Sequence, residues 1–164
     1  MLKVILFSIT ALSISVYAQE HKAHVHGAAQ VSMGFDGSKG KIEFKAPAET
    51  VFGFEHEARS KKDREAKDKG LQALNDNISE MIAFDKELAC EIKMEASQVN
   101  QEKDHADVEV EYAVTCQKPV AGSTITFNFK KGLSRIKKVK VEVIADEVQK
   151  SLEVKKNGES LELK

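Results

Sequence analysis

The sequence predicts an α+β fold, in which antiparallel β-sheet built from hairpins packs with one main amphipathic helix and one disulfide. Most segments alternate apolar and polar residues, as strands with one buried face do. One segment, residues 60–82, instead repeats its apolar residues every three or four positions, which is typical of a helix. The chain shows no internal repeat, so one continuous core is expected.

Composition limits the classes of protein that fit. The chain has 164 residues, of which 41% are hydrophobic and 31% charged, enough apolar mass for one core. Its 25 Lys+Arg and 26 Asp+Glu give a net charge of -1, which argues against a nucleic-acid-binding protein. Since no run of 18 apolar residues occurs, no membrane span is expected in the mature chain.

The N-terminus has the pattern of a secretory signal peptide, predicted over residues 1–18. Lys3 supplies the positive charge, residues 4–16 are mostly apolar, and Val16-Tyr17-Ala18 resembles a cleavage site. Residues 19–164 are then expected to form a single α+β domain. Export would place this domain in an oxidising compartment.

The first expected strands form a hairpin. Apolar positions alternate from Val25 to Phe35, and a turn cluster follows at residues 36–40. The alternation resumes from Ile42 to Ala46, which completes the predicted hairpin.

The main helix is predicted to begin after Ser60, an N-cap residue followed three positions later by Asp63. The apolar positions that would face the core are Ala66, Gly70, Leu71, Leu74, Ile78, Met81 and Ile82. The run Asn75-Asp76-Asn77 is expected to break this helix into two pieces. The charged residues 61–69 are interpreted as its solvated face, with a docking patch as the alternative.

The two cysteines fall in alternating segments, residues 88–94 and 108–116. Cys90 and Cys116 each lie on the apolar side of their predicted strand, so two neighbouring strands would bring the sulfurs together. Such a bond would stabilise the fold by about 3.5 kcal/mol. The alternative is metal ligation by cysteine, but each Cys is isolated and no C-x-x-C occurs, which favours the disulfide.

The C-terminal third is also predicted to be β. Residues 125–129 and 139–145 alternate, and 132–136 is expected to form a turn or a short helix. A final hairpin is predicted around Asn157-Gly158, with a type I′ turn. The pairs expected across this turn are Val154 with Leu161 and Leu152 with Leu163.

The histidines are the best candidates for chemistry. His24 and His26 lie two apart and would share the polar face of a strand. His56 precedes the helix, and His105 begins the second cysteine strand beside Asp107. Imidazole suits Zn, Cu, Fe and Ni, so the four together predict a metal site, which a carboxylate such as Glu55 or Asp107 would complete. Taken singly, each is as well explained by a solvated linker or strand face.

Two further observations bear on the chemistry. Cleavage after Ala18 would make His21 the third residue of the mature chain, a pattern that binds Cu(II) or Ni(II) in a square plane, although a third-position histidine is also common by chance. The sequence contains no G-x-S-x-G, no H-E-x-x-H and no glycine-rich phosphate loop. The protein is therefore not expected to be an enzyme.

Several motifs resemble one family along nearly the whole mature chain. The segments that carry the resemblance are Ala23-His24-Val25-His26-Gly27-Ala28-Ala29, Ala46-Pro47-Ala48, Gly53-Phe54-Glu55-His56-Glu57-Ala58, Cys90, His105-Ala106-Asp107, Tyr112, Cys116-Gln117-Lys118-Pro119 and residues 129–143. They resemble the zinc-regulated periplasmic proteins of the ZrgA type. The first and third segments are the specific ones.

The resemblance implies a periplasmic zinc-binding protein that assists zinc acquisition together with an ATP-binding-cassette (ABC) zinc importer. His24, His26 and His56 fall in the family's histidine motifs, and His105 matches the histidine before its acidic strand. Many members insert a long His/Asp-rich loop before the second cysteine strand, where this chain has only residues 98–104 and no histidine. A bulk zinc-buffering role is therefore not expected.

Two other functions stay open at this point. The same histidines would suit a copper- or nickel-handling protein, and a non-metal envelope module that binds a protein partner would carry them incidentally. Ligands contributed by two protomers of a homo-oligomer also stay open.

Overall fold

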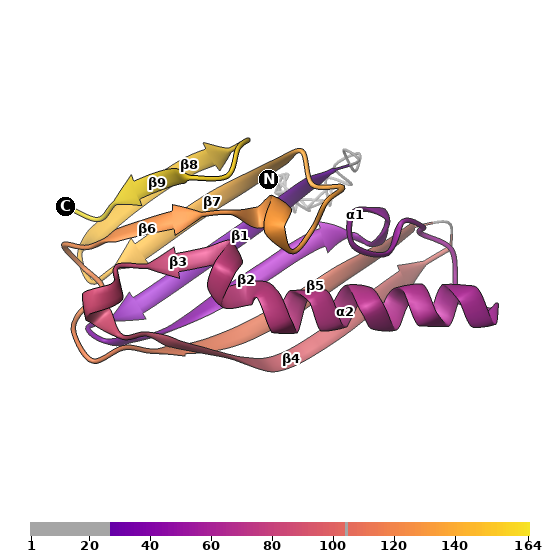
Figure 1. Cartoon of the computed structure of the whole chain (residues 1–164), viewed down its shortest axis with the longest axis horizontal. Coiled ribbons are helices and arrows are strands. Elements are labelled where there is room, and N and C mark those ends of the chain that lie inside the picture. Colours follow the sequence, from indigo (N-terminus) through magenta and orange to yellow (C-terminus); the bar gives the residue numbers. More distant parts are fainter. Residues whose placement is uncertain (1–26, 104) are drawn as a thin grey trace, which may run out of the picture.

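The computed structural model describes residues 27–103 and 105–164 (Figure 1). The predicted signal peptide 1–18 and the candidate residues His21, His24 and His26 lie outside the described residues. The assignment of 19–164 as one domain stays a prediction.

The larger sheet has six strands in the order β4-β5-β2-β1-β7-β8. Their bounds are β1 Ala28–Asp36, β2 Lys39–Pro47, β4 Glu91–Glu102, β5 His105–Thr115, β7 Lys138–Ala145 and β8 Val148–Val154. All neighbours are antiparallel except β1 and β7, which run parallel. Antiparallel hairpins thus dominate, as predicted, and the parallel pair is joined through the long connection that such a pair needs.

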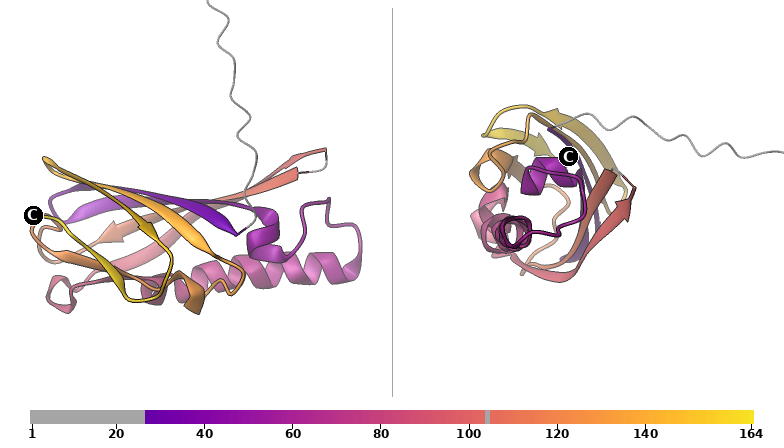
Figure 2. Two further views of the ribbon diagram at one scale, coloured as in Figure 1. Left: turned by 90° about the horizontal axis from the view of Figure 1, so that it is seen from above. Right: turned by 90° about the vertical axis from the view of Figure 1, so that its right-hand side faces the viewer.

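A smaller sheet has the order β3-β6-β9, formed by Ile82–Phe84, Thr124–Phe127 and Glu159–Glu162. Figure 2 shows that the six-stranded sheet is strongly curved, with α2 and the small sheet on its concave side. Phe35 of β1 meets Phe84 of β3 edge-to-face, with ring centroids 5.7 Å apart. The two sheets therefore share one core.

The helices are α1 Ala48–Phe52, α2 Lys61–Met81 and the 3₁₀ turns η1 Lys86–Leu88 and η2 Phe129–Lys131. The N-cap prediction for α2 is confirmed: the Ser60 hydroxyl accepts from the Asp63 N–H, and the Asp63 carboxylate accepts from the Ser60 N–H. Gly70 allows α2 to approach α1, because a Cβ there would lie 2.6 Å from the Phe52 ring.

The core follows from the alternation of the strands. Ala29, Val31, Met33 and Phe35 of β1 are buried, and the residues between them are exposed. From α2, the buried residues are Gly70, Leu74, Ile78 and Met81. Tyr112 of β5 is fully buried and donates its hydroxyl to the Leu74 carbonyl at 3.2 Å, which ties the sheet to the helix.

The predicted disulfide is confirmed. Cys90 and Cys116 are bonded, with an S–S distance of 2.05 Å. Cys90 lies just before β4 and Cys116 just after β5, so the bond closes the base of that long hairpin. A cysteine metal site is thereby excluded. Among the described residues, no helix is both long and apolar enough to cross a membrane.

The predicted break in the helix is wrong, because α2 runs unbroken through residues 75–77. The Asn77 side chain donates to the Ala73 carbonyl at 2.9 Å, one helical turn back, instead of competing with the helix. Leu74 and Ile78 on either side are buried, so packing outweighs the low helix propensity of the three polar residues.

The predicted C-terminal hairpin is also wrong. Strands β8 and β9 are consecutive but belong to different sheets: Val154 pairs with Val139, and Leu161 pairs with Ile125. Gly158 has φ 87°, but Asn157 does not have the positive φ that a type I′ turn requires. β8 pairs with β7 at the edge of the large sheet, and β9 pairs with β6 at the edge of the small sheet. Each pairing sets apolar residues of the two strands side by side, and we infer that this contact outweighs the local turn signal.

Two short elements were not expected from the sequence. Residues 48–52 form α1, where no element is predicted, and residues 82–84 form β3, of which Ile82 is predicted to end the helix. Each is short and packs on elements distant in sequence, so local periodicity carries little signal for it.

Candidate metal centre

The candidate centre lies where the connection between α1 and α2 meets the tip of the β4–β5 hairpin. The connection begins at Gly53, which caps the C-terminus of α1. Its φ of 90° is a left-handed conformation that would be strained for any residue other than glycine. The rings of Phe52 and Phe54 then lie 5.9 Å apart, which anchors the connection on the core. Glu55 and His56 follow directly from this anchored position.

Glu55 and His105 are paired although they lie 50 residues apart in sequence. The His105 Nδ1 atom lies 2.7 Å from Glu55 Oε2. The Glu55 side chain is only 12% exposed, whereas that of His105 is 64% exposed. The second oxygen, Oε1, is buried and has no hydrogen-bond partner among the described residues. A carboxylate has thus been taken out of water to face one imidazole.

This contact fixes the chemistry of the His105 ring. An ionised carboxylate only accepts hydrogen bonds, so Nδ1 must carry the proton and donate. In the neutral ring, Nε2 is then the nitrogen that carries the lone pair of the imidazole. A metal ligand with its other N–H on a carboxylate is the usual arrangement of histidines at zinc.

Gln101 of β4 holds the two partners in place. Its side-chain amide donates to the Glu55 carbonyl at 2.9 Å and to the His105 carbonyl at 3.0 Å. The hairpin tip and the α1–α2 connection are therefore tied together through the backbone of both candidate residues.

Asp107, the other carboxylate considered from sequence, is engaged differently. Its side chain lies 3.6 Å from the Lys45 ammonium of the neighbouring strand β2. Lys45 also contacts Glu109 at 2.6 Å, and this hydrogen bond holds the pKa of the Glu109 carboxyl below its usual value. Glu55, by contrast, lies within hydrogen-bond distance of a described histidine, His105.

His56 is not brought into the same cluster. Its ring stacks on Phe54 with centroids 4.8 Å apart, and its Nδ1 lies 3.0 Å from the Glu57 carbonyl. Within residues 27–103 and 105–164, no three His, Cys, Asp or Glu side chains gather closely enough to hold a metal ion. The described part of the chain therefore contributes a pair, Glu55 and His105, and the ligation predicted for His24 and His26 is untested.

The point at which the N-terminal segment joins the fold is well fixed. The Gly27 N–H donates to the buried Thr50 hydroxyl of α1 at 3.2 Å. The Gly27 carbonyl accepts from the N–H groups of Lys137 and Lys138 at 2.7 and 3.1 Å. The described chain therefore starts beside α1, at the same end of the large sheet as the β4–β5 hairpin tip.

Sequence reasoning named Glu55 and His105 but missed their support. Gln101 and Thr50 act through side-chain hydrogen bonds to the backbone of other segments, and no spacing or motif marks them. Only the fold shows that they fix the approach to the pair.

Comparison with known proteins identifies the family of the chain. No curated protein sequence matches the chain. A family model described as ZrgA family zinc uptake protein matches residues 23–163. This match spans the pair, both cysteines and every described strand. The chain belongs to the ZrgA family of zinc uptake proteins, and its role is related to zinc uptake.

Proposed function

We propose that this protein is an exported, periplasmic accessory protein of zinc acquisition, which binds Zn(II) through His105 together with His24 and His26. His56 is a further candidate ligand. The observation that carries the proposal is the buried Glu55 carboxylate facing His105 at 2.7 Å. The bound zinc is cargo, which the protein would pass to a component of an ABC zinc importer.

The chemistry of the pair supports zinc ligation. With Nδ1 donating to Glu55, Nε2 is the ring nitrogen of His105 whose lone pair suits a metal, and the side chain as a whole is 64% exposed. Zinc in proteins takes four ligands in a tetrahedron at about 2.0–2.1 Å from imidazole nitrogen. One histidine is not enough, so the site needs further ligands from elsewhere in the chain.

The strand register supports the N-terminal histidines as those ligands. Gln30, Lys45 and Glu109 are aligned across β1, β2 and β5. Two strand spacings, about 10 Å, therefore separate β1 from β5, and both strands begin at the same end of the sheet. His26 directly precedes Gly27, and His24 lies three residues before it, a reach of about 10 Å. The histidine pair is thus within chain reach of His105.

The direct test is zinc titration by calorimetry on residues 19–164 in metal-free buffer near neutral pH. We expect a near-stoichiometric site with micromolar or tighter affinity. His24→Ala/His26→Ala should abolish it, and His105→Ala should weaken it by at least about tenfold, since each removes a ligand. Chelator-treated variants should melt like the wild type. Absent binding in calorimetry and in a second metal assay would refute the proposal, as would variants with unchanged affinity.

The pH dependence gives a second test. Neutral imidazole is the ligand, so protons compete with zinc as the pH falls through the ordinary imidazole pKa of about 6.5. We expect affinity to fall steeply between neutral pH and mildly acidic pH. An affinity that stays constant over this range would exclude ligation by histidine.

A further inference from the structure

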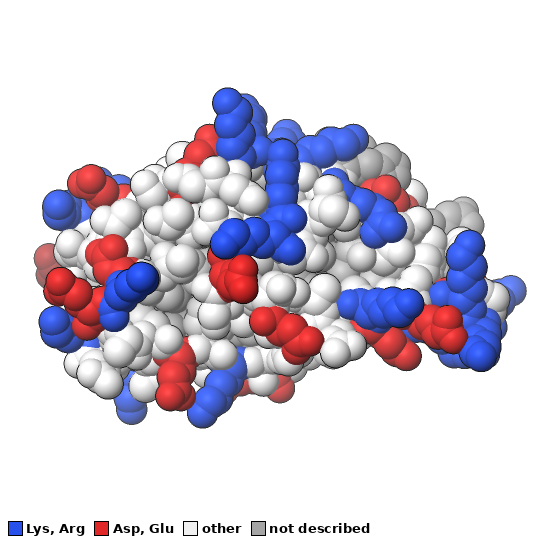
Figure 3. Space-filling view, in the orientation of Figure 1, with Lys and Arg blue, Asp and Glu red and all other residues white. Residues whose placement is uncertain are grey.

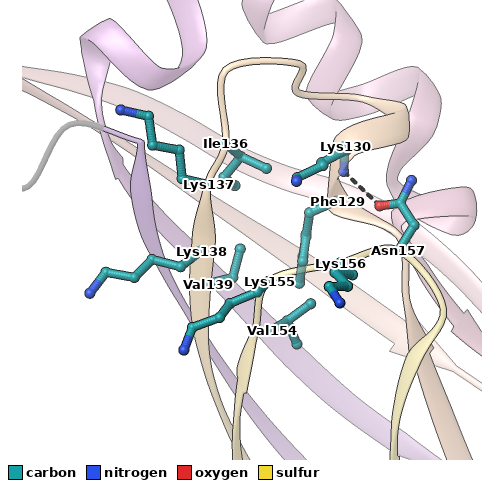
Figure 4. Close-up of a pocket in the computed structure, with 10 residues that line it drawn as sticks. All are labelled: Phe129, Lys130, Ile136, Lys137, Lys138, Val139, Val154, Lys155, Lys156 and Asn157. Carbon is teal, nitrogen blue, oxygen red and sulfur yellow. Dashed lines mark hydrogen bonds between the residues drawn. The ribbon is translucent and has the colours of Figure 1, made fainter.

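Five lysines surround a shallow hollow at the start of β7 and the end of β8 (Figure 4). They are Lys130, Lys137, Lys138, Lys155 and Lys156, hereafter the lysine patch. The other lining residues are Asn157 and four buried apolar residues that form the floor, and none is acidic. The hollow measures about 10 Å³, the space of one water molecule, so no organic ligand fits inside it.

The patch carries an excess of positive charge, since its five lysines lie beside two carboxylates, those of Glu153 and Glu159. Lys138 and Lys155 share one carboxylate, that of Glu153, at 3.8 and 2.7 Å. Lys130, Lys137 and Lys156 form no ion pair with any described residue. Residues 128–140 hold six basic residues and no acidic one, although the whole chain has more acidic than basic residues. Figure 3 shows Lys and Arg gathered on this part of the surface.

The backbone holds these like charges together. The Glu159 carboxylate accepts from the N–H groups of Lys155 and Lys156 at 2.5 and 2.9 Å. The Asn157 side chain accepts from the Lys130 N–H at 3.1 Å, which ties the β8–β9 connection to η2. The lysines are therefore concentrated by a defined turn and not by a mobile tail. Their mutual repulsion is a cost that an anionic partner would offset.

The composition of the patch distinguishes between kinds of partner. Protein interfaces are depleted of lysine and depend on exposed aromatic or arginine anchors. The patch floor is buried, and the exposed large hydrophobic residue among those described, Ile144, lies at the other end of β7. The lysine side chains spread around the hollow instead of converging on one point (Figure 4). Dispersed, flexible point charges suit an extended anionic surface.

We propose that the lysine patch docks the protein on anionic phospholipid headgroups at a membrane surface. The patch includes the two residues, Lys137 and Lys138, whose N–H groups bind the Gly27 carbonyl. Docking would thus place the end of the sheet where the N-terminal segment joins the fold against the membrane. The inference is independent of zinc binding.

The test uses residues 19–164 in chelator, sedimented with vesicles of phosphatidylcholine alone or mixed with phosphatidylglycerol. We expect binding only to the mixed vesicles, weakening as salt screens the charges. Changing Lys130, Lys137, Lys138 and Lys156 to Gln should weaken it by about 100-fold or more. The same four positions changed to Arg should keep it.

The matched control removes the same charge elsewhere. Lys61, Lys62, Lys67 and Lys69 of α2 are changed to Gln, and these lie among acidic residues. We expect this variant to bind like the wild type. Equal loss in both Gln variants, equal binding to both vesicle types, or no binding at low salt would overturn the proposal. Capture by soluble polyglutamate without vesicle binding would overturn it as well, because it would assign the patch to an acidic protein segment.

Discussion

Glu55→Gln is the substitution that isolates the chemistry of the candidate centre. It keeps the size and shape of the side chain and an oxygen that can accept from His105 Nδ1, 2.7 Å away in the wild type. What it removes is the negative charge. In the wild type that charge strengthens the hydrogen bond and makes the imidazole a better donor to a metal.

The expected magnitude follows from the position of the carboxylate. Changing the outer partner of a zinc-bound histidine weakens metal affinity by about 10–100-fold, or about 1.4–2.7 kcal/mol. The Glu55 side chain is 12% exposed, so water cannot readily replace the lost partner, and the effect should lie within this range. Stability without metal should not fall, because the change removes a buried charge whose Oε1 has no partner among the described residues.

Calorimetric zinc titration and thermal unfolding in chelator measure the two quantities separately. Glu57→Gln is the matched control, since Glu57 is 66% exposed and pairs with Arg59 at 2.9 Å. We expect unchanged affinity for the control and a 10–100-fold loss for Glu55→Gln. Unchanged affinity in Glu55→Gln would refute the role of the pair. Loss of affinity that merely accompanies a large loss of stability would show that Glu55 is structural.

Three further changes test the fold. Gly70→Ala should destabilise by about 1–3 kcal/mol because its Cβ meets the buried Phe52 ring, whereas Gly34→Ala has open space and should not; equal denaturant midpoints would contradict this. Replacing both cysteines with Ser should cost about 3.5 kcal/mol for the sequence separation of 26, and a loss below about 1 kcal/mol in urea unfolding would contradict that expectation. Lys45 holds the pKa of the Glu109 carboxyl below its usual value of 4.5, so the pair stabilises above that pH and the effect disappears as the pH falls through the lowered pKa. Glu109→Gln should reduce the loss of unfolding free energy as the pH is lowered below 4.5. Parallel curves of stability against pH for the variant and the wild type would show that the pair contributes nothing.

Local signals predicted the parts of the fold that are determined locally. Ser60 and Asp63 satisfy each other's backbone N–H groups, so the start of α2 can be recognised from four residues. The buried faces of β1 and β5 follow from strict alternation. The disulfide was predictable because the sequence has two cysteines and both fall at apolar positions of alternating segments.

Long-range choices were not predictable from these signals. The Asn157–Gly158 segment looks like a tight hairpin, yet Val154 and Leu161 each find an apolar neighbour on a different sheet. The pairing of Glu55 with His105 depends on where β5 begins relative to α1, and on Gln101 between them. Such contacts are a property of the whole packing.

The central claim is that histidine nitrogens, with no sulfur, hold the zinc. X-ray absorption at the zinc edge of the zinc-loaded protein, residues 19–164, tests it most directly. We expect a first shell of ligand atoms at about 2.0–2.1 Å from the zinc and the multiple-scattering signal of at least two imidazole rings. In His105→Ala, the number of imidazoles that fits this signal should fall by one. Sulfur is not expected, because both cysteines are in the disulfide. A shell of oxygen alone, or one unchanged in His105→Ala, would contradict the claim.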